Sequence, residues 1–226
     1  MANAPPGTQA IAFDIKSLHR TCPILPDHKP WLVVSFRGKF YIDHVHPFGA
    51  CPASSNAGMI CNAAIDIWQA ELCFGNRLFK YEDDIQNFRF PNHDPAGHFQ
   101  DGEFSYIHDR DSAMALISDL HIPWHPEKTG THFMPVSTFI GFQWNLPLHC
   151  VSLPDEKRLK YLSRLTSMLS NHNNGLRFNL RRIQVLHGTL VHVSFVFPNG
   201  SSRLPVFSDF MTGLSSYLFL SHLCIL

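Results

Sequence analysis

The chain has 226 residues, of which 45% are hydrophobic and 12% aromatic, so it can bury a sizeable core and long disorder is not expected. Its 18 basic and 18 acidic residues give a formal net charge of zero at pH 7 with neutral histidines. Proteins that hold nucleic acid by its phosphates usually carry a basic excess, so this balance argues against strong long-range attraction to a nucleic acid.

Hydrophobic periodicity and turn residues predict short strands and helices. Residues 1–9 form a polar lead-in, and residues 91–106 contain two prolines and two glycines, which predicts a long loop. The expected elements are strands at 10–15, 31–36, 39–43, 78–82, 85–90 and 137–143, and helices at about 54–73, 109–120, 155–170 and 179–192. This order predicts an α+β fold, with a short antiparallel sheet backed by helices and a helical C-terminal part.

Two of the expected helices have an apolar stripe at helical spacing. In the second helix we expect the stripe to lie on the sheet, and it consists of Ala113, Leu116, Ile117 and Leu120. The third helix shows the same period at Leu159, Leu162, Leu165 and Leu169. Each stripe predicts one face of its helix that is suited to packing.

Two adjacent aspartates, Asp83 and Asp84, lie between short apolar runs, which predicts a β-hairpin with the acidic pair at its tip. Asp14 ends another apolar run, residues 10–13. If the two strands are neighbours, three carboxylates converge, and a cation would offset their repulsion. Carboxylate oxygens suit Mg²⁺, with Mn²⁺ as the alternative, and indicate nucleotidyl or phosphoryl transfer by two metal ions. The competing interpretation is a solvated acidic turn, the commoner context of an Asp-Asp pair.

The order of short motifs from Asp14 to about Asp209 resembles the palm of a reverse transcriptase, an RNA-directed DNA polymerase, and in particular the fungal retroelement polymerases. The matching segments are Phe13-Asp14-Ile15-Lys16-Ser17 with Arg20-Thr21 and Pro23, Lys39-Phe40-Tyr41-Ile42-Asp43 with Pro47-Phe48-Gly49 and Ser54-Ser55-Asn56-Ala57-Gly58, Tyr81-Glu82-Asp83-Asp84, His125-Pro126-Glu127-Lys128-Thr129, Phe139-Ile140-Gly141-Phe142, Leu153-Pro154-Asp155-Glu156-Lys157, and the segment from Leu186 to Ser194. The resemblance implies a nucleotidyltransferase that acts on an RNA or DNA template-primer and deoxynucleoside triphosphates.

The resemblance also implies roles for individual residues. Asp14 and Asp83 would bind the metal ions with Asp84 in support, and Lys128 would hold or protonate the pyrophosphate. Nucleotide or template contacts would come from Arg20, His19, Phe48, Gly49 and Tyr81, and the primer grip from Phe139, Gly141 and Phe142. For Lys128 the alternative is a solvated side chain, and for Arg20 it is a surface ion pair with Asp27.

The chain departs from the family pattern in three ways. His19 stands where the family has Phe or Tyr against the sugar, which puts sugar discrimination in doubt. The first motif begins so early that we expect the fingers to be missing. The thumb is expected to be short. The expected division of the chain is a palm at 10–150, a partial thumb at 151–210 and an unrelated hydrophobic tail at 211–226.

These departures predict a truncated reverse-transcriptase-like protein of retroelement origin, weak or inactive in template-directed DNA synthesis by itself. One alternative is a non-catalytic palm remnant that binds nucleic acid or protein. Another is a polymerase half that needs a separate chain containing fingers. A palm without its neighbour should also expose an apolar surface where the fingers would pack.

Six cysteines occur without a Cys-x-x-Cys pair, and we expect free thiols in the cytoplasm or nucleus of a cell rather than in a secreted protein. A zinc site at His44, His46 and Cys51 is the weaker alternative. The cysteines are Cys22, Cys51, Cys61, Cys73, Cys150 and Cys224.

No segment reaches the roughly 18–20 apolar residues of a membrane-spanning helix, so no membrane partner is expected. Residues 214–226 are hydrophobic but short, and we interpret them as an out-of-frame or intron-derived end, with a partner-binding tail or a membrane anchor as alternatives.

Overall fold

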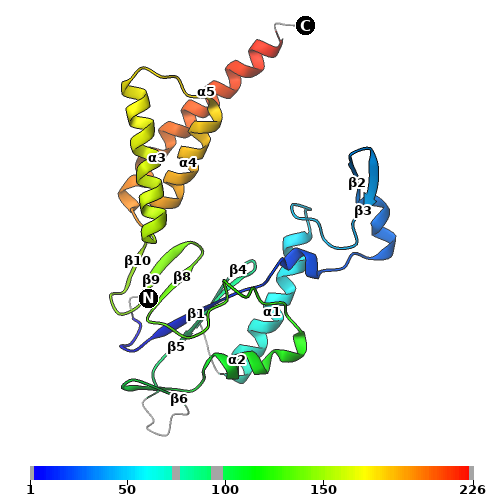
Figure 1. Cartoon of the computed structure of the whole chain (residues 1–226), viewed down its shortest axis with the longest axis vertical. Coiled ribbons are helices and arrows are strands. Elements are labelled where there is room, and N and C mark those ends of the chain that lie inside the picture. The colour runs from blue at the N-terminus through cyan, green and yellow to red at the C-terminus, as the bar shows by residue number, and fades with distance from the viewer. Residues whose placement is uncertain (1–2, 73–76, 93–98, 224–226) are drawn as a thin grey trace. The chain divides into compact units, whose positions relative to one another are not determined.

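The computed structural model describes residues 3–72, 77–92 and 99–223. The chain forms two compact units, Met1–Cys150 and Val151–Leu226 (Figure 1). The first unit contains β1 (Gln9–Asp14), β2 (Val33–Phe36), β3 (Lys39–Ile42), α1 (Ala53–Glu71), β4 (Leu78–Tyr81), β5 (Asp84–Arg89), β6 (Phe99–Asp101), β7 (Phe104–Tyr106), α2 (Arg110–Leu116), β8 (Val136–Phe139) and β9 (Phe142–Asn145). The short strand β10 (Cys150–Ser152) begins where the first unit ends, and the second unit contains α3 (Asp155–Asn173), α4 (Leu180–Ser194) and α5 (Leu204–Leu223).

The central sheet of the first unit has the strand order β1-β5-β4 and is antiparallel throughout. In its register Phe13 lies opposite Ile85, and both side chains are fully buried. Helix α1 packs on this sheet through a stripe at spacings of three and four residues, namely Ala57, Cys61, Ala64 and Trp68. The fold is therefore mixed α+β with small antiparallel sheets, as the sequence predicts.

Two predicted segments differ from the structure. Residues 91–106 are not only a loop, because β6 and β7 form a hairpin whose turn contains Gly102 at a φ of 62°. Residues 137–143 are not a single strand, because Ile140 and Gly141 form the turn between β8 and β9 with φ values of 44° and 82°. Positive φ at both central residues is the geometry that joins antiparallel strands through two residues.

The two predicted apolar stripes are buried only in part. Ala113 and Ile117 are buried, whereas Leu116 and Leu120 are each 37% exposed, because α2 ends at Leu116 and is followed by a 3₁₀ turn. In the second unit, three of the four stripe leucines of α3 are exposed, namely Leu159, Leu162 and Leu169. The buried face of that unit belongs instead to α4, through Ile183, Leu186 and Thr189.

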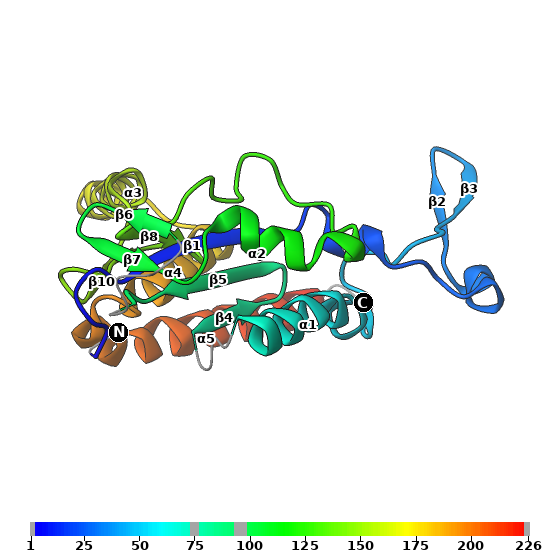
Figure 2. The same cartoon turned by 90° about the horizontal axis from the view of Figure 1, so that it is seen from below.

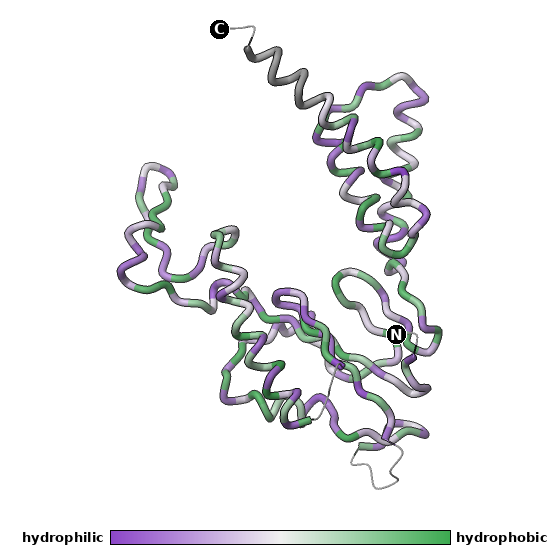
Figure 3. The backbone as a smooth tube through the Cα atoms, turned by 180° about the vertical axis from the view of Figure 1, so that it is seen from behind, coloured by the Kyte–Doolittle hydropathy of each residue, from purple (hydrophilic) through white to green (hydrophobic). Residues whose placement is uncertain are grey.

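The hairpin of β2 and β3 stands away from the rest of the first unit (Figures 1 and 2). Every residue of both strands is exposed, so neither face of the hairpin is covered. The strands are largely hydrophobic and the tip is hydrophilic (Figure 3). A two-stranded hairpin is marginally stable in water without a third strand or a helix against it. Its large exposed apolar residues are Val33, Val34, Phe36, Phe40, Tyr41 and Ile42.

We therefore expect the purified chain to associate with itself at micromolar concentration and to bind a hydrophobic dye. The double substitution Phe36→Ser with Phe40→Ser should reduce both effects, because it removes two exposed rings from the hairpin. Size-exclusion chromatography over a dilution series measures the association. The control is Lys39→Ser on the same hairpin, and a wild-type monomer that binds no dye would contradict the expectation.

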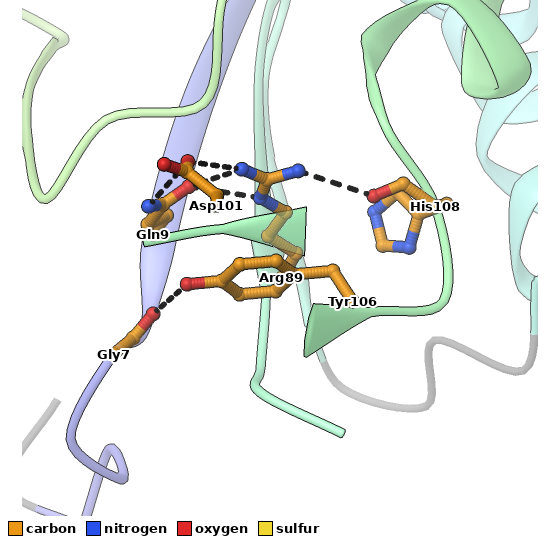
Figure 4. A network of polar contacts seen from close by, with 6 residues as sticks. All are labelled: Gly7, Gln9, Arg89, Asp101, Tyr106 and His108. Carbon is orange, nitrogen blue, oxygen red and sulfur yellow. Dashed lines mark hydrogen bonds and ion pairs between the residues drawn. The ribbon is translucent and has the colours of Figure 1, made fainter. Parts of the chain in front are cut away.

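A buried polar network fixes the other end of the central sheet (Figure 4). Arg89 and Gln9 are opposite each other on β5 and β1, and the Arg89 Nε donates to Gln9 Oε1 at 2.9 Å. The Arg89 guanidinium also pairs with Asp101 at 2.8 Å and lies 3.9 Å from the centre of the Tyr106 ring. The Tyr106 hydroxyl donates to the Gly7 carbonyl at 2.7 Å. These contacts tie β1 and β5 to the β6–β7 hairpin.

His108 contributes to this network through its carbonyl, which accepts from Arg89. Burial, and then the positive charges of Arg89 and Arg77, lower the pKa of His108 from 6.5 to about 4. An unfolded chain takes up this proton near pH 6.5, whereas the folded chain does so only near pH 4. The contribution of neutral His108 to stability is therefore complete above about pH 6.5 and is lost as the pH falls towards 4.

We expect the free energy of unfolding to fall between pH 7 and pH 4 by about 3 kcal/mol more in the wild type than in His108→Phe. The Phe side chain does not titrate and preserves an aromatic contact with Phe133, whose ring centre is 5.3 Å from that of His108. The raised pKa of Asp84 acts in the opposite direction in both proteins and cancels in the comparison. Urea titrations followed by tryptophan fluorescence measure the difference, and equal pH profiles would contradict it.

Within the described ranges of the chain, no helix combines the length and the apolar character that crossing a membrane requires. Four cysteines in these ranges are free, with Cys22 and Cys61 buried and Cys51 and Cys150 exposed. Burial raises the pKa of the Cys61 thiol to about 11, so this thiol is unreactive at neutral pH. Cys73 and Cys224 lie outside the described residues.

Candidate active site

The acidic hairpin joins β4 to β5 through a two-residue turn, Glu82 and Asp83. Asp84 is already the first residue of β5 and lies opposite Tyr81, so the two aspartates do not share the tip as predicted. Glu82 has a φ of 51°, which a side chain adopts at a cost of about 1–2 kcal/mol. Such strain is typical of functional turns, and here it occurs in the residue directly before Asp83 and Asp84.

The β1–β5 register places Asp14 directly opposite Asp84. The two strands remain joined beyond this pair, because the Ile15 amide donates to the Asp83 carbonyl at 3.2 Å. Asp14 is 4% exposed, whereas Asp83 and Asp84 are half-buried. The end of β1 and the start of β5 therefore bring two carboxylates together from segments far apart in the sequence.

A third segment, residues 125–129, closes on Asp14. The His125 amide donates to the Asp14 carbonyl at 2.7 Å, and the Thr129 hydroxyl lies 3.2 Å from both the amide nitrogen and the carbonyl oxygen of Asp14. Lys128 Nζ donates to Asp14 Oδ2 at 2.9 Å. Sequence reasoning singled out Lys128 but not His125 or Thr129 as site residues, although both stand in the motif that contains Lys128.

The charges in this site are unbalanced, with three aspartates near one lysine. The pKa of Asp84 is raised to about 6, chiefly by burial, then by its hydrogen bond with the Asp14 carboxyl and by the negative charges of Asp83 and Asp14. The pKa of Lys128 is raised, first by its hydrogen bond to Asp14. Lys128 is therefore a firmly protonated cation that compensates only part of the negative charge.

The donor atoms of this site fit Mg²⁺, which takes one or two carboxylates and completes its shell with waters and substrate phosphates. Asp14 and Asp84 supply two such carboxylates in direct register. Among the described residues, no three His, Cys, Asp or Glu side chains form a metal-binding group, so the Asp83 carboxylate does not complete a three-residue set in this conformation. Within the same described residues, His44, His46 and Cys51 do not form a zinc-binding group, and His46 bonds instead to Asn56.

Three of the predicted nucleotide-binding residues, His19, Phe48 and Gly49, form one local cluster. The His19 ring lies edge-on to Phe48, with ring centres 5.3 Å apart, and its Nε2 contacts Ser54 Oγ at 3.2 Å. Phe48 is 87% exposed, and Gly49 beside it has a φ of 88°. A flat exposed ring beside a glycine, whose lack of a side chain lets a ligand approach the backbone closely, is suited to stacking on a base or a sugar.

Arg20 pairs with Asp43 at 2.7 Å, so the alternative ion pair that was expected with Asp27 is wrong. The hydrogen bond from Arg20 lowers the pKa of Asp43 below its usual value. Tyr81 is exposed on β4 and lies opposite Asp84, beside the acidic site.

The predicted primer-grip segment forms the tip of the β8–β9 hairpin. Phe139 and Phe142 are buried, so the turn presents the backbone of Ile140 and Gly141 rather than the aromatic rings. The hairpin is attached to the central sheet, because Gln86 on β5 donates to the Ser137 hydroxyl at 2.7 Å. The strand that begins with Asp84 therefore also anchors this hairpin.

No family model matches the chain, and no curated protein matches it in sequence. Its structure is similar to the foamy viral protease-reverse transcriptase in complex with RNA/DNA hybrid, with a TM-score of 0.56 and 13% identity over 92% of this chain and 27% of that one. It is also similar to the foamy viral protease-reverse transcriptase dRH in complex with ds DNA, with a TM-score of 0.55 and 14% identity over 91% and 31% of the two chains. The chain has a reverse-transcriptase-like fold and spans less than a third of either viral chain.

Proposed function

We propose that this chain is a reverse-transcriptase-like protein of fungal retroelement origin, with a palm at residues 10–150 and thumb helices at 151–210. Its ancestral reaction is template-directed DNA synthesis by two-metal nucleotidyl transfer, and its own activity is weak. The observation that carries the proposal is the register that sets Asp14 opposite Asp84, with Lys128 on Asp14. The likeness of the fold to polymerases that were solved with nucleic acid supports it.

Asp14, Asp83 and Asp84 are the residues that would hold the metal. When bound, Mg²⁺ supplies activation of the primer 3′-hydroxyl and stabilisation of charge on the leaving pyrophosphate. Thr129 and His125 hold the Asp14 backbone, so its carboxylate is positioned before any ligand arrives. Lys128 carries a positive charge to the site and, once displaced from Asp14, can hold or protonate the pyrophosphate.

Three features account for weak activity. The chain has no net positive charge to attract a template. His19 occupies the position at which a larger ring would exclude a 2′-hydroxyl, so discrimination between sugars is poor. The β2–β3 hairpin is uncovered, and a partner chain that contains fingers would cover it and would also align the triphosphate. Without that alignment, a misplacement of the triphosphate by about 1 Å can reduce the rate about 100-fold.

A second candidate function is a palm remnant that binds nucleic acid or protein without catalysis in the cytoplasm or nucleus. The ion pair between Lys128 and Asp14 favours it, because the lysine supplies the cation that the carboxylate would otherwise take from solution. The two candidates make different predictions for nucleotide addition.

Primer extension with deoxynucleoside triphosphates and Mg²⁺ or Mn²⁺ tests the proposal, with and without a fingers-containing chain. We expect barely detectable extension by the chain alone, a clear gain when fingers are supplied, and loss of both in Asp83→Asn. The matched control is Asp66→Asn on the exposed side of α1, which should not change the rate. Extension that survives Asp83→Asn would contradict the proposed site, and its complete absence under every condition would favour the non-catalytic function.

A further inference from the structure

Lys128 belongs to a loop that is bonded to β1 at both ends, and this loop, from His125 to Gly130, is called the lysine loop below. The His125 amide donates to the Asp14 carbonyl at 2.7 Å, and the Gly130 amide donates to the Ala12 carbonyl at 2.8 Å. Lys128 lies between these two anchors, and its side chain is 62% exposed. A side chain this exposed has little packing to restrain it, so its ion pair with Asp14 depends on where the loop backbone lies.

The second of the two anchors requires a glycine. A Cβ atom added to Gly130 would lie 2.7 Å from Ile11 Cγ1 on β1, which is closer than side chains pack in folded proteins. Only glycine therefore allows the lysine loop to approach β1 this closely. Gly130 follows Lys128 by two residues, so a displacement of Gly130 from β1 would also move the lysine away from Asp14.

Helix α2 holds the same glycine through its first residue. The Arg110 Nε donates to the Gly130 carbonyl at 3.0 Å, and the guanidinium also pairs with Asp111 at 2.9 Å. The start of α2 is fixed by a capping box, in which the Asp109 side chain accepts from the Ser112 amide and the Ser112 hydroxyl accepts from the Asp109 amide. A charge-assisted hydrogen bond from an ordered helix start therefore reaches the end of the lysine loop.

We propose that Arg110 is a positioning residue that holds the lysine loop against β1 and thereby keeps Lys128 on Asp14 while no substrate is bound. In this arrangement Lys128 competes with a metal ion for the Asp14 carboxylate. Substrate phosphates offer Lys128 another anionic partner, so the carboxylate becomes available to metal when a nucleotide arrives. The inference rests on the proposed function for its metal ion, whereas the contact between α2 and the lysine loop can be tested without any metal.

Mn²⁺ binding, measured by electron paramagnetic resonance at pH 7.5 without nucleotide, tests the competition. Arg110→Met should bind Mn²⁺ about threefold more tightly than the wild type, which is the scale of coupling within one hydrogen-bond network. Gly130→Ala should show the same gain without a change of charge, because its Cβ atom would push the loop away from Ile11. The matched control is Arg37→Met, which removes the same charge from an exposed arginine on the β2–β3 hairpin and should keep the wild-type affinity.

The same measurement in a Lys128→Met background shows whether Arg110 acts through the lysine. Adding Arg110→Met or Gly130→Ala there should not change the affinity further, because the competing ammonium is already absent. A wild-type affinity in the single variant Arg110→Met would overturn the proposal. A gain that persists in the Lys128→Met background would also overturn it, because such a gain does not come from the release of Lys128.

Hydrogen exchange without metal tests the contact of α2 with the lysine loop. The Gly130 amide should exchange about tenfold faster in Arg110→Met than in the wild type, because the charge-assisted bond to Gly130 is lost. Arg110→Lys, which retains a donor, should restore most of the protection. The Met134 amide, which donates to the Ala10 carbonyl at 2.9 Å, should exchange at the wild-type rate in every variant.

Equal protection of Gly130 in the wild type and Arg110→Met would overturn the proposed role of Arg110, whatever the Mn²⁺ result. A wild type that binds no Mn²⁺ would contradict the proposed function and, with it, the competition for metal. Faster exchange at Gly130 in that case would show that the contact with α2 exists, so the two failures are distinguishable.

Discussion

Replacing Trp68 with alanine should lower the free energy of unfolding of the first unit by about 3–5 kcal/mol. Trp68 is fully buried, its ring centre lies 5.1 Å from that of Phe13, and its indole N–H donates to the Ala113 carbonyl at 2.6 Å. The substitution leaves a cavity between α1, α2 and β1. Because a typical domain has only about 5–15 kcal/mol of stability, much of the unit should unfold at moderate urea concentration.

The four tryptophans of the chain all lie in the first unit, so their fluorescence during a urea titration reports its unfolding. Trp31→Ala is the matched control, because the Trp31 side chain is 84% exposed. We expect that control to change stability by less than about 0.5 kcal/mol. Equal losses in the two variants would mean that the core does not centre on α1 and β1. Because Phe13 packs on Trp68 and directly precedes Asp14, the loss of core packing in Trp68→Ala should also disorder the acidic site.

Replacing Arg89 with methionine should cost about 3 kcal/mol and loosen the sheet at the end away from the acidic pair. The variant loses the bonds to Gln9 and Asp101 and the stacking over Tyr106. Methionine fills part of the same volume, so the loss measures the polar network rather than a large cavity.

Urea unfolding of Arg89→Met measures this loss, and hydrogen exchange at the amides of β1 and β5 locates it. Arg37→Met at the tip of the β2–β3 hairpin is the control, because Arg37 is exposed. Protection at Gln9 should fall more than protection at Asp14, since the network lies at the Gln9 end of the ladder. A variant as stable as the wild type would show that the guanidinium contacts do not hold the strands together.

The sequence predicted the acidic hairpin well because local signals agree there. β1 carries a continuous apolar run at residues 10–13, and a slip of one residue in its pairing with β5 would turn Phe13 and Ile85 away from α1. This constraint is sufficient to bring Asp14 near Asp84. It does not give the conformation of the turn, because a glutamate at a φ of 51° carries no sequence signal for a turn that usually needs glycine.

The sequence did not allow two features to be predicted: polar contacts between residues far apart in the chain, and whether another element covers an apolar helix face. The bond between Lys128 and Asp14 joins residues 114 positions apart, and nothing in their neighbours specifies it. The partners of Arg20 and Arg89 depend in the same way on tertiary packing. Periodicity identified the leucine stripe of α3 correctly as one helix face, but the spacing of Leu159, Leu162 and Leu169 gives no information on whether another element covers them.

The central claim is that the aspartates around β1 and β5 form a divalent-metal site, and Mn²⁺ binding measured by electron paramagnetic resonance tests it most directly. At pH 7.5 the wild type should bind Mn²⁺, and Asp14→Asn should bind at least about tenfold more weakly because it removes one of two paired carboxylates. Lys128→Met should bind at least as tightly as the wild type, because the ammonium no longer competes for Asp14. Asp66→Asn serves as the control on α1. Equal Mn²⁺ affinity in the wild type and Asp14→Asn, or no binding by either at millimolar Mn²⁺, would contradict the account.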